Sequence, residues 1–215
     1  MPLTSLQTAF SHERMGRYLE WSGGNPTGAL RLYTLNAQLS EALYIPLQAL
    51  ELSLRNRMHD AMSLHHGPAW LLDDSSCLQE KQKQKVRRAL EDLTRNRKPH
   101  APEQVVSTLS FGFWTALLGR EYEQLWRETL HRIASKQNGK SIGRKDLSAP
   151  LTTIRKLRNR IAHHESILQY DLTRHHADMR RIIGWLSAEA EQWCAECDRF
   201  QVIYPSTGYQ LALAA

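Results

Sequence analysis

The chain has 215 residues, of which 41% are apolar and 23% are charged. This composition predicts one folded domain with a full hydrophobic core and excludes long disordered tracts, which have a poorer apolar content. The formal net charge of +6 favours an anionic partner, most commonly nucleic acid, whereas a solvated basic surface is the simpler explanation of the same charge.

The first third of the sequence predicts helices separated by glycine and proline breaks. A first helix is expected over residues 4–20, and the glycines and the proline of residues 22–26 end it. Leucine and other apolar residues then recur every three or four positions over residues 28–65, which is the period of an amphipathic helix. Pro46 interrupts this pattern and predicts a kink or a short break. The apolar residues 70–72 are expected to be buried after the helix ends.

The middle of the sequence alternates between charged and apolar helical segments. Residues 79–96 are charged and periodic and predict a surface helix, followed by a basic loop over residues 95–100. Residues 103–118 are more apolar and predict a helix that contributes to the core. A further helix is expected over residues 122–133, and the polar residues 135–144 predict a loop.

The last third of the sequence predicts a short helix, then a longer helical region. The short helix spans about 150–164, and residues 170–200 form one long helix or two. A short strand at residues 201–204 is the one candidate for β-structure, and residues 205–215 are expected to be a flexible tail. These elements predict an all-α fold with a single domain over residues 1–204.

Targeting signals and membrane segments are not evident in the sequence. The amino terminus has no charged start followed by an apolar run, so we expect no signal peptide. No window approaches the roughly 18 uninterrupted apolar residues that span a bilayer. We therefore expect a cytoplasmic protein that does not enter a membrane.

The three cysteines do not predict a disulfide framework, because their number is odd. Cys194 and Cys197 have a spacing found in zinc sites, but no second such pair and no nearby histidine pair completes four ligands. Two semi-buried thiols in a reducing compartment are the favoured interpretation, and a zinc protein is the weaker alternative. We expect no metal and no other cofactor.

The segment over residues 154–165 combines cations, an amide and imidazoles on one predicted helix. Its isoleucine and leucine positions recur at helical spacing and face the core. Arg155, Asn159 and His163 are four residues apart, so they line an adjacent face, and Arg158 emerges at its rim. A cation, an amide and an imidazole would thus reach one anionic group.

Such a combination suits the cleavage of RNA without a metal. A neutral imidazole can take the proton of the 2′-hydroxyl or protonate the leaving 5′-oxygen. A fixed guanidinium stabilises the negative charge that develops on the phosphorus oxygens. The alternative is that these residues simply form a solvent-exposed helix face that ends in a cap.

The segment over residues 157–165 resembles the signature of Abi-like, or abortive-infection, proteins of the HEPN superfamily. That signature is an arginine, then four to six residues, then a histidine, usually with a polar residue after the arginine. Arg158 and Asn159 match its first two positions, and His163 matches its histidine. His164 also fits the spacing, so the choice stays open; His163 is preferred because it shares a face with Asn159.

Three further blocks resemble the same family in the expected order. They lie within residues 29–36, 50–71 and 109–126, so the resemblance covers roughly residues 10–170. It implies an all-α, HEPN-like helical bundle with additional helices and a homodimer through the motif helix, in which two motifs form one cleft. It also implies an RNA endonuclease of the abortive-infection or toxin type in phage defence, with an antitoxin as a further candidate partner.

The resemblance and the residue chemistry together assign roles. His163 would be the acid/base, Arg158 would bind the scissile phosphate, and Asn159 would position one or both. Arg155 and Arg160 would bind RNA elsewhere on the same helix. The alternative is a non-catalytic HEPN module that binds RNA, a nucleotide or a protein through this basic face.

A second arginine–asparagine pair, Arg55 and Asn56, lies within the expected long helix. Glu51 is four residues before Arg55, and an exposed pair at that spacing stabilises a helix by about 0.3 kcal/mol. If this helix packs beside the motif helix, Glu51 and Arg55 could instead orient the catalytic histidine.

Overall fold

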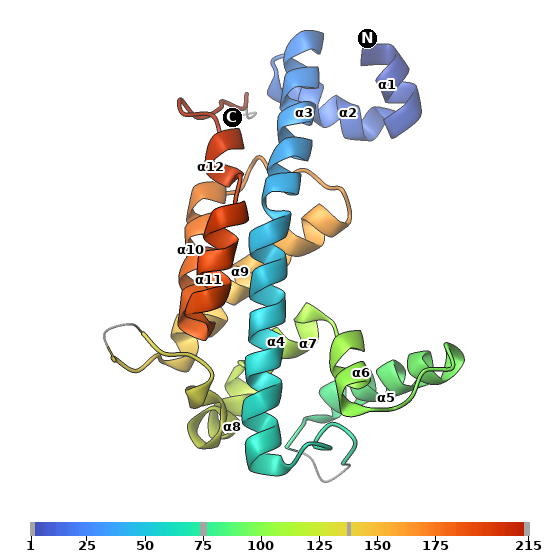
Figure 1. The fold of residues 1–215 in the computed structure, drawn as a ribbon. Coiled ribbons are helices and arrows are strands. Elements are labelled where there is room, and N and C mark those ends of the chain that lie inside the picture. Colours follow the sequence, from blue (N-terminus) through green and yellow to red (C-terminus); the bar gives the residue numbers. More distant parts are fainter. Residues whose placement is uncertain (1–2, 74–76, 137–138, 213–215) are drawn as a thin grey trace.

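The computed structural model describes residues 3–73, 77–136 and 139–212, and these residues form helices and loops without a strand, which confirms the all-α prediction (Figure 1). The helices are α1 (Leu3–Phe10), α2 (His12–Trp21), α3 (Pro26–Ala42), α4 (Tyr44–His66), α5 (Glu80–Arg95), α6 (Pro102–Thr108), α7 (Phe111–Ala116), η1 (Arg120–Tyr122), α8 (Glu123–Glu128), η2 (Leu130–Arg132), α9 (Arg144–Ala162), α10 (Leu172–Leu186), α11 (Ala188–Cys197) and α12 (Phe200–Ile203). No helix in these ranges combines the length and the apolar character needed to cross a bilayer.

Helices α3 and α4 lie end to end and form the long axis of the molecule (Figure 1). The expected break in the long helix is confirmed, but it falls at Leu43 rather than at Pro46. Leu43 N still donates to Leu39 O at 3.0 Å, so the chain turns there with little loss of hydrogen bonding. Pro46 lies in the first turn of α4, where a backbone N–H has no helical partner to lose.

The expected single helix over residues 4–20 is wrong, because the chain divides into α1 and α2 at Ser11. Ser11 has a φ of 82°, which is left-handed backbone and cannot continue a helix. Its hydroxyl instead accepts a hydrogen bond from Arg14 N at 3.2 Å and caps α2. Residues 103–118 and 122–133 are likewise divided into short helices rather than continuous ones.

Helix α9, which carries the motif, starts at Arg144 and not near residue 150. The Asp146 carboxylate accepts a hydrogen bond from Gly143 N at 3.0 Å and thereby caps the helix. The buried guanidinium of Arg144 anchors this first turn, 2.6 Å from a Glu123 carboxylate oxygen and 2.6 Å from Leu118 O. Pro150 therefore lies inside the helix, where it removes one backbone donor.

The carboxy-terminal region forms two helices, α10 and α11, followed by the short helix α12. Ser187 separates the first two, and its hydroxyl caps α11 by accepting from Ala190 N at 3.1 Å. The strand considered for residues 201–204 is wrong, since α12 occupies that segment. Within the expected flexible tail, Tyr209 donates to Leu168 O at 2.8 Å and Ala212 N donates to Trp21 O at 2.8 Å. Residues 213–215 lie outside the described part.

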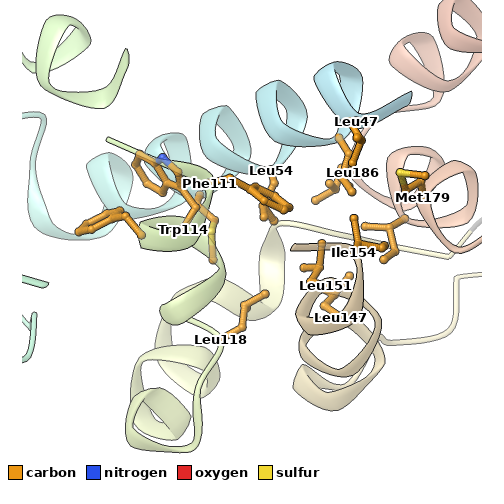
Figure 2. Packing of buried hydrophobic residues seen from close by; sticks show 14 of the residues in the cluster. Leu47, Leu54, Phe111, Trp114, Leu118, Leu147, Leu151, Ile154, Met179 and Leu186 are labelled. Atoms are coloured by element: carbon orange, nitrogen blue, oxygen red, sulfur yellow. The ribbon is translucent and has the colours of Figure 1, made fainter. Parts of the chain in front are cut away.

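The core lies where α4, α7, α9 and α10 meet, and Figure 2 shows its packing. Helix α4 forms one side of this core, and α7, α9 and α10 pack against it or against each other. Burial of these side chains fixes the rotation of α9 about its own axis. The labelled core residues are Leu47, Leu54, Phe111, Trp114, Leu118, Leu147, Leu151, Ile154, Met179 and Leu186.

Candidate functional site

Arg158 on α9 reaches towards α4 and contacts Glu51. Ile154 and Leu157 are both fully buried, so Arg158 emerges at the edge of the buried stripe, as predicted. Its Nε atom lies 2.7 Å from Glu51 Oε1, and its Nη2 atom lies 3.5 Å from Oε2. The arginine of the motif is therefore held by a carboxylate that lies more than 100 residues earlier in the sequence.

A groove of about 750 Å³ opens beside this ion pair, and we call it the Arg158 groove. Its walls are the end of α3, the first three turns of α4, the end of α9 with the residues after it, and α12. The lining is largely apolar. Glu51 and Arg158 form an ion pair between α4 and α9, and Glu41 on α3 lies 3.6 Å from Arg199, just before α12. The apolar lining residues are Tyr44, Ile45, Leu47, Leu52, Ile161 and Ile203. The charged and imidazole lining residues are Glu41, Glu51, Arg55, Arg158, His164 and Arg199.

Arg55 also lines the groove and has a donor without a partner. Its Nε atom is buried and makes no hydrogen bond within the described residues. No ion pair joins Glu51 to Arg55 in that part of the chain, because the Glu51 carboxylate is turned to Arg158. A buried donor without an acceptor is unfavourable by about 1–3 kcal/mol.

Helix α9 ends in a tight turn that places His164 in a left-handed conformation. His163 caps the helix, with a φ of −96°, and the next residue, His164, has a φ of 54°. His164 N donates to Ile161 O at 3.0 Å, and Glu165 N donates to Arg160 O at 2.8 Å. This is the Schellman pattern, in which the left-handed position is usually glycine. A histidine at that position is strained by about 1 kcal/mol, and such strained residues often cluster at functional sites.

The segment after α9 is pinned by side chains from three helices. The Arg14 guanidinium of α2 donates to His164 O. The buried amide oxygen of Asn36, on α3, accepts from Ile167 N at 2.8 Å and from the Ser166 hydroxyl at 3.4 Å. Arg160 Nε donates to Ser166 O at 2.8 Å. These contacts fix the position of the backbone at His164.

The sequence reasoning assigned no role to Asn36 or Arg14. Asn36 could have been recognised, because it interrupts the apolar stripe of its helix seven residues after Ala29 and three before Leu39. An amide at such a position must find a hydrogen-bond partner when it is buried. Nothing in the local sequence distinguishes Arg14 from other surface arginines.

The predicted site residues divide into two groups in the structure. The groove brings together four of them: Glu51, Arg55, Arg158 and His164. Three others are exposed and do not line it: Asn56, Asn159 and His163. His163, the histidine preferred from the sequence, thus lies outside the groove, whereas its neighbour His164 lines the groove.

The two arginines predicted to bind RNA have different surroundings. Arg160 is occupied within the chain, since it pairs with Glu165 at 3.0 Å and its guanidinium lies over the Tyr170 ring. Arg155 lies on another side of α9, against Gly112 of α7. Neither lines the Arg158 groove.

The cysteines are free thiols in the structure. Cys194 is buried, and this burial raises the pKa of its thiol to about 11. In the described residues, no group of three or more histidine, cysteine or acidic side chains is arranged to hold a metal ion.

Comparison with known proteins gives one result. The profile of a family described as "Abi-like protein" matches residues 3–169, which is more than half of the chain and includes the motif helix. No curated protein matches the chain, and no solved structure does. The chain therefore belongs to the Abi-like protein family.

Proposed function

We propose that this Abi-like protein is a metal-independent RNA endonuclease of the abortive-infection or toxin type, built on a HEPN-like helical bundle. The observation that supports this most is the shared position of Arg158 and His164 at one groove. A guanidinium and an imidazole at one site suit phosphodiester cleavage by the 2′-hydroxyl. The name of the family points to abortive infection, which agrees with a role in phage defence.

The chemistry needs a base, an acid and a cation. The base removes the proton of the RNA 2′-hydroxyl, and the 2′-oxygen forms a bond to the adjacent phosphorus. The bond from phosphorus to the 5′-oxygen breaks, and this oxygen takes a proton from the acid. The products are a 2′,3′-cyclic phosphate and a 5′-hydroxyl. Arg158 would stabilise the charge on the phosphorus oxygens, and the guanidinium of Arg55, which lines the same groove, would add a second cation.

Two histidines are candidates for the proton transfer. His163 has the spacing of the family motif, and Asn159 would position it or hold a phosphate oxygen. His164 lines the groove with Arg158 and has the strained backbone often found at functional residues. A homodimer through α9 would use both, because the exposed His163 and Asn159 of one copy would then face the groove of the other.

The test is cleavage of a defined single-stranded RNA by the purified protein in EDTA. Wild type is compared with Arg158→Ala, His163→Ala and His164→Ala, and Lys156→Ala serves as the control because it is an exposed cation on the same helix. We expect Arg158→Ala and at least one histidine variant to lose cleavage by 100-fold or more, roughly the weight of an acid/base or charge-stabilising group. Undiminished cleavage in all three variants contradicts the site, and loss of wild-type cleavage in EDTA contradicts the metal-free mechanism.

A non-catalytic module that binds RNA, a nucleotide or a protein in phage defence is the second candidate. The Arg158–Glu51 ion pair supports it, since the carboxylate neutralises the cation that a phosphate would need. This function predicts salt-dependent RNA binding without products. Detection of a 2′,3′-cyclic phosphate end that depends on Arg158 excludes it.

A further inference from the structure

The positive charge of the chain gathers in two segments, residues 80–100 and residues 140–160. Residues 80–100 contain eight lysines and arginines against three acidic residues, a surplus of five charges in a chain whose net charge is +6. This segment is α5 with the turn that follows it. In Figure 1, α5 and α6 lie on the opposite side of α4 from α10 and α11. Residues 80–100 are therefore a strongly basic region that lies apart from α10 and α11.

Three cations of α5 form a stripe along one side of the helix, and we call Lys81, Lys85 and Arg88 the basic stripe. They are four and three residues apart, so their side chains lie above one another. The buried residues of α5 lie beside this stripe and face α6 and the core. Two of the three acidic residues of α5 pair with cations outside the stripe, Glu80 with Arg87 and Asp92 with Arg95. In the described part of the chain, no carboxylate pairs with any member of the stripe.

The stripe continues onto the motif helix through Arg155. Lys81 and Arg155 lie close enough to Lys85 that, with partial burial as the larger cause, they lower the pKa of its ammonium group. Arg155 packs against α7 at Gly112, since a Cβ atom there would be in ordinary van der Waals contact with Arg155 Nη1, at 3.8 Å. Lys85 and Arg155 are half-buried, and like charges placed close together favour an anion between them.

The turn after α5 presents two more cations in a fixed conformation. Arg97 has a φ of 54°, and its N–H donates to Thr94 O at 3.0 Å. Lys98 N donates to Leu93 O at 2.9 Å, which completes the same Schellman pattern that ends α9. The basic residues expected in a loop are thus held at the end of α5.

The chemistry of this surface favours a nucleic acid over a protein or a membrane. None of the exposed large apolar side chains of the described residues lies between positions 80 and 100. Protein interfaces and membrane-bound helices need such side chains as anchors, whereas nucleic-acid interfaces are polar and positively charged. We propose that the basic stripe, with Arg155, Arg97 and Lys98, is a second RNA-binding surface that holds the phosphate backbone of a single strand away from the Arg158 groove. The choice of RNA over DNA rests on the proposed function.

Binding of a 20-nucleotide single-stranded 2′-O-methyl RNA tests this proposal, because the probe lacks the 2′-hydroxyl and cannot be cut. The stripe variant carries Lys81→Gln, Lys85→Gln and Arg88→Gln. A matched control removes the same charge from exposed cations elsewhere, with Arg31→Gln, Arg132→Gln and Lys145→Gln. Circular dichroism and thermal unfolding establish that both variants are folded. Affinity is measured as a function of salt concentration.

We expect the stripe variant to bind at least tenfold more weakly than the control at 0.1 M salt. The slope of log K against log salt should fall in magnitude by about two, since each lost phosphate contact on a single strand removes about 0.7. Equal affinities of the stripe variant and the control overturn the proposal. The proposal is also overturned if wild type binds vesicles rich in phosphatidylserine more tightly than RNA and the stripe variant no longer binds these vesicles.

The outcome separates this surface from the proposed nuclease. Loss of binding in the stripe variant supports the surface even if wild type cuts no RNA. Cleavage that depends on Arg158, together with unchanged binding in the stripe variant, supports the nuclease and overturns the surface.

Discussion

The Nε atom of Arg158 lies 2.7 Å from Oε1 of Glu51, and this contact connects the motif helix to α4. Nη2 approaches the other carboxylate oxygen at 3.5 Å, so the guanidinium meets both oxygens of Glu51. The two side chains are 37% and 24% exposed, so solvent screens the pair and it contributes little to stability. We infer that its main effect is to orient the guanidinium towards the groove.

The variant Glu51→Gln should separate two effects of Glu51, the orientation of the Arg158 guanidinium and the negative charge of the carboxylate. Glutamine removes a negative charge that repels RNA, so we expect the affinity for 2′-O-methyl RNA to rise about threefold, as expected for one partly screened charge. The cleavage rate constant at saturating RNA should fall about tenfold, because the guanidinium is held less firmly and small displacements are costly in catalysis. Single-turnover kinetics and a binding titration measure the two effects.

Glu41→Gln is the matched control for this change. Glu41 also lines the groove and lies 3.6 Å from Arg199, but it has no contact with Arg158. Glu41→Gln should raise the affinity for 2′-O-methyl RNA to a similar extent, and its cleavage rate constant should stay within about twofold of that of wild type. An equal fall of the rate constant in both variants would show that Glu51 has no special role in orienting Arg158.

His164→Gly should be more stable than His164→Ala by about 1 kcal/mol. Glycine adopts the φ of 54° without the steric cost that a Cβ atom brings, whereas alanine keeps that cost. Urea unfolding of both variants measures the difference. Both lack the imidazole, so their cleavage rates should agree whichever histidine transfers the proton. Equal stability would contradict a left-handed conformation at this position.

Asn36→Ala should destabilise the protein by roughly 2 kcal/mol, because it leaves the buried N–H of Ile167 without an acceptor. Cleavage should also fall, since the backbone that carries His164 loses one of its restraints. Ser166→Ala is the control, because it removes the 3.4 Å hydrogen bond to Asn36 and the contact with Tyr18 but keeps the 2.8 Å hydrogen bond from Ile167 N. Urea unfolding should show a clearly smaller loss for the control; equal losses would argue that the amide has no specific role.

A buried cluster next to α12 should make stability depend on acid pH. The Asp198 carboxylate contacts His176 and lies 3.0 Å from Arg180 Nη1. Burial alone would raise the pKa of Asp198, but the Phe200 N–H, His176 and Arg180 outweigh it and hold that pKa below the usual value. The ionised carboxylate therefore stabilises the fold above the pKa of the unfolded state, about 3.9, and this contribution disappears as pH falls through the lower folded pKa.

Asp198→Asn mimics the protonated carboxyl and should lower the free energy of unfolding at pH 7 by roughly 3 kcal/mol. The difference from wild type should stay constant between pH 7 and pH 5 and shrink below about pH 4. Urea unfolding across this range provides the measurement. Asp178→Asn is the control, because Asp178 pairs only with the exposed Arg181. A difference that shrinks already between pH 7 and pH 5 would mean that another group dominates.

Helix content and the order of the segments followed directly from the sequence. The periodic apolar positions 154 and 157 are buried, as are residues 70 and 71, whereas Leu72, which was expected to be buried with them, is 41% exposed. Helix ends were less predictable. The left-handed backbone of Ser11 and the capping of α9 at Gly143 depend on hydrogen bonds that a hydrophobic period does not contain. The expected strand at residues 201–204 failed because four residues carry too little pattern to separate α12 from β-structure.

The composition of the motif was a property of the sequence alone: Arg158, Asn159 and the two histidines follow each other at a spacing typical of the Abi-like family. Which of them meet in space was decided only by the tertiary structure. The turn at the end of α9 gives His164 a left-handed backbone, so counting residues at 100° could not place that imidazole. Glu51 and Asn36 come from helices folded back against α9, and long-range packing of that kind leaves no signal at the motif itself.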